Sequence, residues 1–540
     1  MKLYSICLLS FLILSACEIS SSGSSSSNTT TTSSTTSTDT ETYAALTKLI
    51  LTDDPDYDYE VGSTAYYVDA SSGSDDNDGS EDAPFATISY ALAQASGGEV
   101  IYVADGDYGD LQFGATFYDS GKSTPIDEVF TDWVTLKAMD GQSPTLGNLE
   151  LGTLHDDGGW YTIDFDQVGN SDLRLRVDGF TITDDVSISG SRYVDIRNCT
   201  ISQSGDFATM TEDEKSDFMS EPGIGVYNGE YISLLYNEIT STGMGIWAMT
   251  TDFVIKGNHI HNNTHDGIQI LGGSNWLIEN NIIHDLDDGT ADGEGTDYNM
   301  HVDGVQMYIA SSAAKYAHRM DNLTFRGNLI YHVESMDVMI NSTSIDGGGY
   351  SNFIWENNIF GPSGGYLFIH GAEIEDSDIF RHNTVLYTPN DQWTSDWGRE
   401  FGSGFGTPDS DDYYIQTWWT SDKHSGYVYY NNILVNSIMS SPWTTIEDNG
   451  NYAYNNIYYT DDTDSTLDDD AGYKVSTLPY DAIDTDVLDV VENGNIPGYP
   501  YSGSVVIDNG YIPSDIDSYS KDFAGNTRDD SPDIGALEYY

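Results

Sequence analysis

FVIKGNHI, at residues 253–260, is followed by WLIENNII at residues 276–283, and in both a run of alternating side chains ends in an Asn, one further residue and an Ile. Seven other stretches of the chain repeat this phrase closely. Aligned, the nine stretches place these residues in one column: Cys199, Asn237, Asn258, Asn281, Asn328, Asn358, Asn383, Asn432 and Asn456. Self-similarity at a spacing of roughly 20–50 residues is typical of a solenoid. Alternation with a period of two predicts that each repeat is made of strands.

The Asn column predicts how the strands are joined. Asn tolerates left-handed backbone angles, so it suits a tight bend between two strands. Stacked Asn side chains can also hydrogen-bond along the column, as they do in other stacked sheets. We therefore expect an all-β protein, a right-handed parallel β-helix solenoid with an Asn ladder, whose rungs run from about Leu173 to Tyr459. The column is expected to be structural and not catalytic.

The strands that open successive rungs can be aligned as well. One column is expected to point inward: Ile246, Ile268, Val305 and Val338. The neighbouring column is expected to point outward: Trp247, Gln269, Gln306 and Met339. Two long insertions flank Asp303, and long loops on one side of a rigid solenoid are where function normally lies.

The charge balance excludes one class of partner. Among the 540 residues, 19 are Lys or Arg and 88 are Asp or Glu, which gives a formal net charge of −69. No basic stripe is present, so we expect no nucleic-acid binding. This charge favours a soluble monomer, and the many carboxylates favour calcium as a bound cofactor. An anionic polymer would be repelled unless cations bridge it or local Lys and Arg residues attract it.

The N-terminus predicts export. MKLYSICLLSFLILSAC has a short basic start and an apolar run of signal-peptide length, and its last four residues resemble a bacterial lipobox. We expect residues 1–16 to be a lipoprotein signal peptide, with lipid attached to the thiol of Cys17. Residues 17–60 then form a Ser/Thr-rich tether, and residues 61–540 form one β-helix domain. This predicts a location in the bacterial cell envelope, as an outer-membrane lipoprotein or at the cell surface. An ordinary signal peptide with a chance Cys is the alternative.

Both ends of the mature chain carry a family resemblance. YYVDASSGSDDNDGSEDAPFATISYALAQASGGEVIYVADGDY, residues 66–108, resembles the opening segment of secreted pectate-lyase-like β-helix proteins, including family 9 polysaccharide lyases. DFAGNTRDDSPDIGALEY, residues 522–539, resembles their closing segment. The resemblance implies a surface enzyme that degrades a polysaccharide. Residues 88–95 are expected to form a short helix that caps the open end of the solenoid.

Two adjacent rungs carry the best candidate site. THDGIQI, residues 264–270, and HVDGVQM, residues 301–307, should stack Asp266 on Asp303 and Gln269 on Gln306. Neighbouring strands lie about 4.8 Å apart. Two carboxylates that close must share a proton, bind a cation or each find a donor. Alternatively, both Asp residues cap the turns into their strands, because Asp-Gly is a common turn pair.

The first functional hypothesis is a calcium-assisted lyase that cleaves an acidic, uronate-containing polysaccharide by β-elimination. Family 9 lyases carry an Asp-Asp-Gly-aromatic-Asp run that binds calcium, and THDGIQ resembles it, with Asp266 matching one ligand. The chain departs from that run at His265, Ile268 and Gln269, and Gln306 stands where the family's Lys base is expected.

These departures leave several side chains as candidates for each role. The catalytic candidates are Asp266, Asp303, His265, His301, Lys315 and Arg319. The substrate-binding candidates are Trp247, Gln269, Gln306, Tyr308 and His318, where the aromatic rings could stack on sugars. The metal-ligand candidates are Asp266, Asp303 and Asp297. The base in a β-elimination could be His265, His301, His318, Lys315 or Arg319.

Two further hypotheses stay open. A glycoside hydrolase needs two carboxylates, which Asp266 and Asp303 could provide, although the Gly-His-Gly and Arg-Ile-Lys signatures of polygalacturonase-like hydrolases are missing. A non-catalytic glycan-binding surface protein could use the same aromatic residues. The acidic loop that begins at Asp285 could bind calcium through Asp285, Asp287, Asp288, Asp292 and Asp297, although its spacing matches no EF-hand.

Overall fold

The computed structural model describes residues 58–114, 129–152, 171–205, 207–288, 302–309, 319–340, 349–361, 363, 368–370, 374–386, 393–394, 400–401, 427–435, 452–454, 456–459, 473–475, 507–508, 510, 521–529, 531–533 and 535–538. The predicted signal peptide and the lipid site at Cys17 lie outside these residues, as does almost all of the tether, so they stay predictions. Within the described residues, no helix is long and apolar enough to cross a membrane.

The described strands form two long parallel sheets of 19 and 12 strands. The larger sheet contains β1 (Thr64–Val68), β2 (Glu99–Val103), β3 (Leu111–Gly114), β4 (Val134–Ala138), β6 (Leu149–Gly152), β7 (Ser171–Asp178), β9 (Val186–Ser189), β10 (Ser191–Arg197), β12 (Pro222–Leu235), β14 (Met244–Lys256), β16 (Ile268–Glu279), β18 (Asp303–Met307), β19 (Arg319–Arg326), β21 (Met336–Ile340), β22 (Gly349–Glu356), β24 (Phe368–His370), β25 (Ile374–Arg381), β29 (Tyr427–Tyr430) and β31 (Tyr452–Tyr454). The smaller sheet contains β5 (Thr145–Leu146), β8 (Thr181–Ile182), β11 (Thr200–Ile201), β13 (Glu238–Thr240), β15 (His259–His261), β17 (Ile282–Leu286), β20 (Leu329–Val333), β23 (Ile359–Phe360), β26 (Thr384–Leu386), β30 (Ile433–Val435), β32 (Asn456–Tyr459) and β33 (Tyr473–Val475). A separate antiparallel pair joins β27 (Trp393–Thr394) to β28 (Glu400–Phe401).

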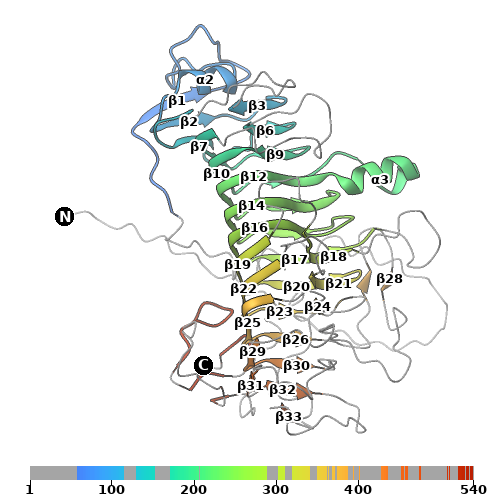
Figure 1. The fold of residues 1–540 in the computed structure, drawn as a ribbon. Coiled ribbons are helices and arrows are strands. Elements are labelled where there is room, and N and C mark those ends of the chain that lie inside the picture. Colours follow the sequence, from blue (N-terminus) through green and yellow to red (C-terminus); the bar gives the residue numbers. More distant parts are fainter. Residues whose placement is uncertain are drawn as a thin grey trace, which may run out of the picture.

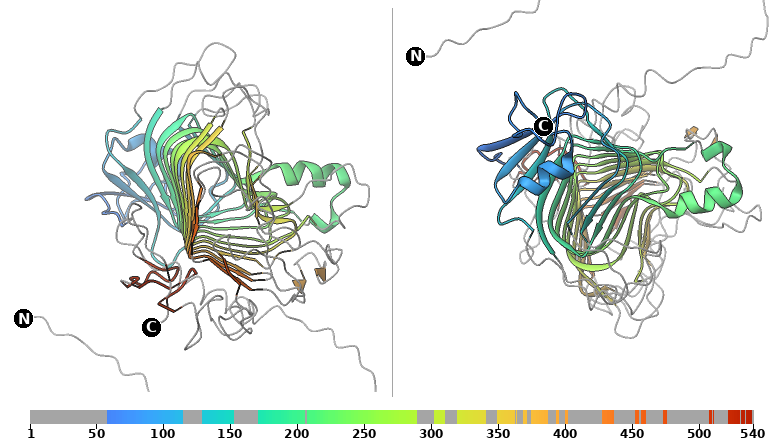
Figure 2. Two further views of the ribbon diagram at one scale, coloured as in Figure 1. Left: turned by 60° about the horizontal axis from the view of Figure 1, so that its bottom comes forward. Right: turned by 90° about the horizontal axis from the view of Figure 1, so that it is seen from above.

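The rungs stack along one axis, from the blue N-terminal end to β33 (Figure 1). Each rung crosses three faces, which is clear along the axis in Figure 2. The first half of β16 pairs with β18 on the first face, and its second half pairs with β19 on the second face. The third face is the smaller sheet, where β17 pairs with β15 and β20. The predicted parallel β-helix is confirmed.

The two columns expected on the first face are also confirmed. Parallel pairing joins these residues in sequence: Ile246, Ile268, Val305 and Val338. All four are fully buried in the apolar core. The same pairings align the outward column: Trp247, Gln269, Gln306 and Met339. Period-two alternation therefore predicted the side-chain directions of this face correctly.

The Asn ladder forms as the sequence predicted. The Oδ1 atom of Asn281 accepts hydrogen bonds from the backbone N–H of Asn258 at 2.9 Å and from its Nδ2 at 3.0 Å. The Nδ2 of Asn281 donates in turn to Oδ1 of Asn328 and to the carbonyl of Ile255, both at 2.9 Å. Each buried amide thus satisfies backbone groups of the preceding rung and bonds the Asn side chain of the next one, which is why the residue type repeats.

One part of the bend prediction is wrong. The residue that adopts left-handed backbone angles is the one before the ladder position, such as Asn280 with φ 55° and Asn357 with φ 55°. Gly257 and Gly327 fill the same place on other rungs, with φ 66° and 62°. The ladder Asn is therefore selected by its side-chain hydrogen bonds, while its predecessor, often Asn or Gly, makes the turn.

The predicted N-terminal cap is present. The helix α2 (Ile88–Gln94) begins after Thr87, whose hydroxyl accepts from the backbone N–H of Tyr90. Ile88, Ala91 and Leu92 are buried in the core beneath the helix. The helix therefore covers apolar side chains that the first rung would otherwise expose.

A second helix lies at the corner where each rung enters the first face. After the short helix η2 (Phe207–Thr209), α3 (Glu212–Ser220) starts with a capping box formed by Thr211 and Glu214. The helix projects from the side of the solenoid (Figures 1 and 2). Its C-cap carbonyl, on Glu221, accepts from the backbone N–H of Met244 at 3.1 Å. This corner is also where Asp266 and Asp303 lie.

The C-terminal segment packs along the rungs. Arg528, which is buried, donates through Nη2 to Asn357 Oδ1 at 2.8 Å and to the carbonyls of Gly535 and Ala536. The backbone N–H of Ala536 donates to the hydroxyl of Thr384 at 3.0 Å. The segment that resembles a family closing segment thus contacts the bends beside the Asn ladder.

Candidate functional site

The Asp-Gln pairs form one hydrogen-bonded network at the start of β16 and β18. Gln269 and Gln306 are paired in register. Nε2 of Gln269 donates to Asp266 Oδ2 at 2.9 Å and to Gln306 Oε1 at 3.1 Å. Nε2 of Gln306 donates to Asp303 Oδ2 at 3.1 Å. The structure therefore brings together four of the residues that the sequence analysis selected.

Both carboxylates of this network are fully buried, with 0% exposure for Asp266 and for Asp303. Oδ1 of Asp266 accepts from the backbone N–H of Asp303 at 2.9 Å, so Asp266 caps the next rung as the structural alternative expected. A capping carboxyl group can also take part in a functional site. The catalytic and metal-binding roles of both residues therefore stay predictions. The Gln amides, 6% and 9% exposed, are nearer to solvent than the carboxylates.

Two further candidates lie beside this network with little exposed surface. His265 is 6% exposed, and its Nε2 lies 4.0 Å from Asp266 Oδ1, which is too long for a hydrogen bond. Trp247 is also 6% exposed because its ring packs against Tyr227, with centroids 4.4 Å apart. Stacking of Trp247 on a sugar stays a prediction that requires movement of its neighbours.

Tyr308 and Arg319 lie farther along the rung. Tyr308 follows β18, is half-buried, and donates its backbone N–H to the carbonyl of Ile270 at 2.9 Å. Arg319 opens β19 on the second face, where its Nη2 pairs with Asp321 Oδ1 at 3.0 Å. Arg319 is thus at the far end of the first face from Asp303. The remaining candidates lie outside the described residues: His301, Lys315, His318, Asp292 and Asp297.

A cluster of three carboxylates lies at the same corner as the Asp-Gln network. One carboxylate oxygen from each of Asp287, Asp288 and Glu334 lies within 4.8 Å of the other two. Exposure is 0%, 2% and 0%, respectively. Oε2 of Glu334 also accepts from the backbone N–H of Asp288 at 2.9 Å. We name these three residues the carboxylate trio.

Asp287 and Asp288 are candidates from the sequence, whereas Glu334 is not. Pairing of β17 with β20 aligns Leu286 with Val333, so Glu334 occupies on its rung the place that Asp287 occupies on the preceding one. Aligning HDLD, residues 284–287, with YHVE, residues 331–334, by the ladder would have found it. The trio adjoins the first face directly, because the backbone N–H of Ser335, next to Glu334, donates to the carbonyl of Val302 at 3.0 Å.

Asp337 was also missed. It lies on β21 next to Met336, which pairs with Asp303, and its side chain is fully buried. Burial raises the pKa of Asp337 well above its usual range, and the nearby charge of Asp303 raises it further, against the lowering effect of the hydrogen bond from Ser363. A buried carboxyl group that stays protonated beside another carboxylate is a typical arrangement for acid–base chemistry.

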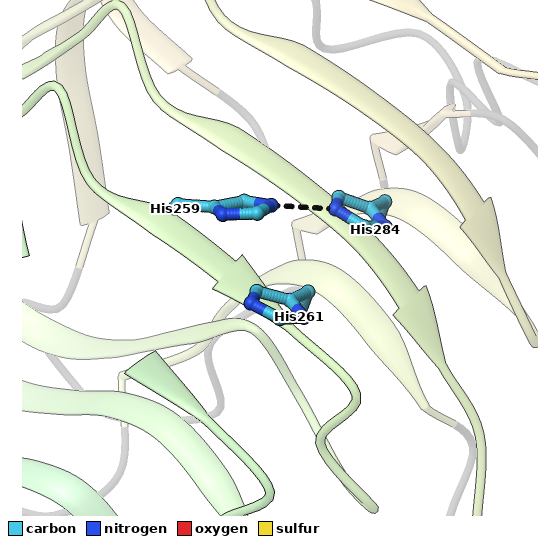
Figure 3. A group of neighbouring side chains, drawn as sticks. All are labelled: His259, His261 and His284. Carbon is cyan, nitrogen blue, oxygen red and sulfur yellow. Dashed lines mark hydrogen bonds between the residues drawn. The ribbon is translucent and has the colours of Figure 1, made fainter. Parts of the chain in front are cut away.

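Three histidines meet on the outer side of the third face, from β15 and β17. Figure 3 shows His259 and His284 pointing toward each other, with His261 beside them. The Nε2 atoms of His259 and His284 are 2.7 Å apart, and one ring nitrogen from each of the three lies within 4.8 Å of the others. We name these residues the histidine cluster. The sequence signal was His-Ile-His, since residues i and i+2 of a strand share a face.

A partly buried carboxylate orients the histidine cluster. Asp285 accepts from His284 Nδ1 at 2.8 Å and from His332 Nδ1 at 3.2 Å. Burial alone would raise the pKa of Asp285, but the two imidazoles hold it below its usual range. Burial lowers the pKa of His284 and, more strongly, that of His259, where the neighbouring histidines lower it further. His259 and His284 are therefore neutral near pH 7.

Comparison with known proteins supports the fold. Residues 167–307 match the family model described as "Right handed beta helix region", and residues 71–118 match "Protein of unknown function (DUF1565)". Together with the stacked parallel strands, the first match establishes a right-handed parallel β-helix. No curated protein sequence matched this chain.

Several solved structures resemble the chain loosely. A pectate lyase, Pel9A, is 13% identical, with a TM-score of 0.41 over 89% of this chain and 97% of that one. A GH136 lacto-N-biosidase from Eubacterium ramulus is 12% identical, with a TM-score of 0.37 over 73% and 67%. PfbA, a surface adhesin of Streptococcus pneumoniae, is 12% identical, with a TM-score of 0.33 over 55% and 80%. At these scores, none of the three assigns an activity to this chain.

Proposed function

We propose that this chain is a polysaccharide-degrading enzyme of the bacterial cell surface, a calcium-assisted lyase that cleaves an acidic, uronate-containing polysaccharide. The observation that carries the proposal is the carboxylate trio beside the strand that opens with Asp303. A protein of net charge −69 repels an anionic polymer. A cation bound at this corner would reduce that repulsion at the place where the polysaccharide binds.

The trio fits calcium by chemistry and by size. Carboxylate oxygens are the ligands that Ca²⁺ prefers, at about 2.3–2.6 Å, so two ligands of one ion lie at most about 5 Å apart. The three side chains already hold their oxygens within 4.8 Å of one another. Burying three carboxylates together is costly unless protons or cations compensate the charge. The backbone N–H of Asp288 fixes Glu334 in place, so the set is preorganised.

The reaction then assigns roles to the chain's own residues. Bound calcium would supply positive charge beside the uronate carboxylate, which acidifies the adjacent C–H. The amides of Gln269 and Gln306 orient the sugar through hydrogen bonds. His301 or Lys315 removes the proton as general base. The electron pair left on carbon forms a double bond while the glycosidic C–O bond at the β carbon breaks, and the departing oxygen takes up a proton.

A glycoside hydrolase is the second candidate, and Asp337 is the observation in its favour. Its pKa is raised mainly by burial and further by Asp303, as suits the acid of a hydrolase pair. Asp337 has 0% exposure, so this mechanism requires the corner to open before Asp337 reaches a substrate.

Products distinguish the two reactions. The purified protein is incubated with a panel of algal and plant polysaccharides, with and without chelator. A lyase creates an unsaturated uronyl end that absorbs in the ultraviolet, and its activity returns when calcium is added back. Reducing ends without ultraviolet absorbance would support the hydrolase instead. Binding without either product would support the glycan-binding hypothesis.

The proposed cell-surface location depends on Cys17. In cells that express the chain, Cys17→Ser should move the protein from the membrane fraction to the soluble fraction. Unchanged fractionation would refute lipid attachment at this residue.

A further inference from the structure

We propose that the histidine cluster is a second metal site, in which His259, His261 and His284 bind a divalent transition-metal ion such as Zn²⁺. The site lies on the third face of the solenoid, away from the Asp-Gln network on the first face. The inference does not rest on the proposed lyase activity, because its test measures metal binding without any polysaccharide.

The backbone brings the three rings together. His259 and His261 both point outward because they are two residues apart on β15, while Ile260 between them is buried. Parallel pairing places His284 of β17 directly beside His261. The rings of His261 and His284 are nearly parallel, at 6° and with centroids 5.3 Å apart, and His259 reaches His284 through Nε2.

The hydrogen bond to Asp285 fixes which nitrogen of His284 can bind metal. The carboxylate of Asp285 only accepts, so Nδ1 of His284 carries the proton and donates at 2.8 Å. Nε2 of His284 therefore presents its lone pair to His259. A carboxylate behind a metal-binding imidazole is the usual arrangement in protein metal sites, where it orients the ring and increases its basicity. His332, which also donates to Asp285, holds this carboxylate in place.

A metal ion can replace the proton between the two rings. Two Nε2 atoms 2.7 Å apart share one hydrogen, which must be on His259 because His284 offers its lone pair. On binding, His259 changes tautomer: Nε2 gives up its proton to solvent while Nδ1 takes one up, so the ring stays neutral and both Nε2 atoms can coordinate the ion. Tetrahedral Zn²⁺ with Zn–N distances of about 2.0–2.1 Å separates two ligand nitrogens by roughly 3.3 Å. Modest rotations of the partly exposed His259 and His261 would accommodate this change.

The ligand set selects a different ion from the carboxylate trio. Imidazole suits Zn²⁺, Cu²⁺ and Ni²⁺, whereas carboxylate oxygens suit Ca²⁺. Glu238 could provide a fourth ligand, because its Oε1 lies 3.4 Å from His261 Nε2 and its side chain is 48% exposed. A water molecule could fill the same position. Metal binding would tie β15 to β17, the strand that leads into Asp287 and Asp288.

Ring stacking alone is the alternative. His284 also stacks on Tyr331 at 10°, so the rings form part of an aromatic column that could serve packing only. The two interpretations differ in one measurable property. A packing column has no need of metal, whereas the proposed site binds one ion tightly through named nitrogens.

The test is a Zn²⁺ titration by calorimetry of the chelator-treated protein, in excess Ca²⁺ to occupy weak carboxylate sites. We expect one Zn²⁺ per chain, and a visible spectrum typical of tetrahedral nitrogen ligands when Co²⁺ is used. His259→Gln should weaken binding at least 100-fold, more than the ~10–100-fold loss that typically follows removal of a partner behind a ligand. Asp285→Asn should fall in that smaller range. The variant His265→Gln changes a histidine outside the cluster, so it should bind Zn²⁺ as tightly as the unaltered chain.

The melting temperature of each metal-free variant separates binding from folding. Zn²⁺ should raise the melting temperature of the unaltered chain and of His265→Gln, but not that of His259→Gln. The proposal is wrong if the unaltered chain binds no stoichiometric Zn²⁺ in the presence of Ca²⁺, or if a folded His259→Gln variant binds it equally well.

Discussion

The Asn ladder and the Asp-Gln network both use a side-chain oxygen to accept a hydrogen bond from a backbone N–H of a neighbouring rung. The oxygen belongs to an amide in the ladder and to a carboxyl group in the network. Oδ1 of Asn328 accepts from the backbone N–H of Asn281, and Oδ1 of Asp266 accepts from the backbone N–H of Asp303. The ladder amides also donate, so each one satisfies its neighbours and the column continues through many rungs. A carboxylate cannot donate, so the two Asp residues need the Gln amides as donors.

This difference distinguishes a structural repeat from a candidate site. A neutral, self-satisfying column costs little to bury and can be extended indefinitely. A pair of buried carboxyl groups needs outside donors, and its neighbour Asp337 has a pKa that burial raises and that Asp303 raises further. The carboxylate trio is found at the same corner. Replacing amide by carboxylate, and the reverse, is therefore the most direct way to test the contrast.

Asp303→Asn should produce the largest effect. It preserves the shape and one acceptor oxygen but removes the charge, so we expect activity on the cleaved polysaccharide to fall about 10²–10³-fold, the range seen when one electrostatic partner of the transition state is lost. The melting temperature should change little. Full activity, or a collapsed fold, would assign Asp303 to turn capping alone. Asp266→Asn, made separately, measures the effect of neutralising the other carboxyl group of the pair.

Asn281→Ala tests the ladder, with an expected loss of about 1–3 kcal/mol in the free energy of unfolding, because buried backbone groups lose their partner. Chemical denaturation monitored by circular dichroism measures it. Asn281→Asp keeps the acceptor for Asn258 but removes the Nδ2 donor and buries a charge. It should be the less stable of the two variants at neutral pH. Equal stability of both with the unaltered chain would mean that the ladder bonds contribute nothing.

Glu334→Gln tests the carboxylate trio. It removes one of three charges while keeping an oxygen, so the calcium concentration for half-maximal activity should rise by about 10-fold or more, since calcium affinity follows ligand charge. Activity at saturating calcium should be largely restored. Glu238 is a carboxylate on the third face, away from the trio, so Glu238→Gln is the control. An unchanged calcium requirement would place the functional ion elsewhere.

Asp337→Asn should have the smallest effect, on the pH dependence of stability. In the folded chain the pKa of Asp337 is raised by burial, whereas in the unfolded chain it is ordinary. Between these two pKa values the folded state holds the extra proton, so stability falls as pH rises, by up to about 1.4 kcal/mol per pH unit. Asp337→Asn should remove this component, as measured by denaturation at several pH values. Parallel profiles for both proteins would contradict the raised pKa.

Much of the fold could be predicted because its determinants are local and repeated. A two-residue period sets which side chains point inward, and one Asn per rung marks the bend, so Ile268 was assigned correctly to the core and Gln269 to the opposite side of its strand. The left-handed residue was misassigned by one position, since Asn280 and Asn281 are both Asn and only backbone angles distinguish turn from ladder.

The sequence by itself determined the parallel β-helix, the Asn ladder and the stacking of Asp266 with Asp303 and of Gln269 with Gln306. Only the tertiary structure decided that both carboxylates are buried, and that oxygens of Asp287, Asp288 and Glu334 come within 4.8 Å of one another. It also decided that His284 contacts His259 of the neighbouring rung. The burial of a side chain and its distance from others depend on the path of each rung and on the residues that pack over it. Insertions of variable length separate the rungs in the sequence, so these distances cannot be read from the linear chain. Repetition encodes direction, whereas sites arise from contacts between residues that the repeat places side by side.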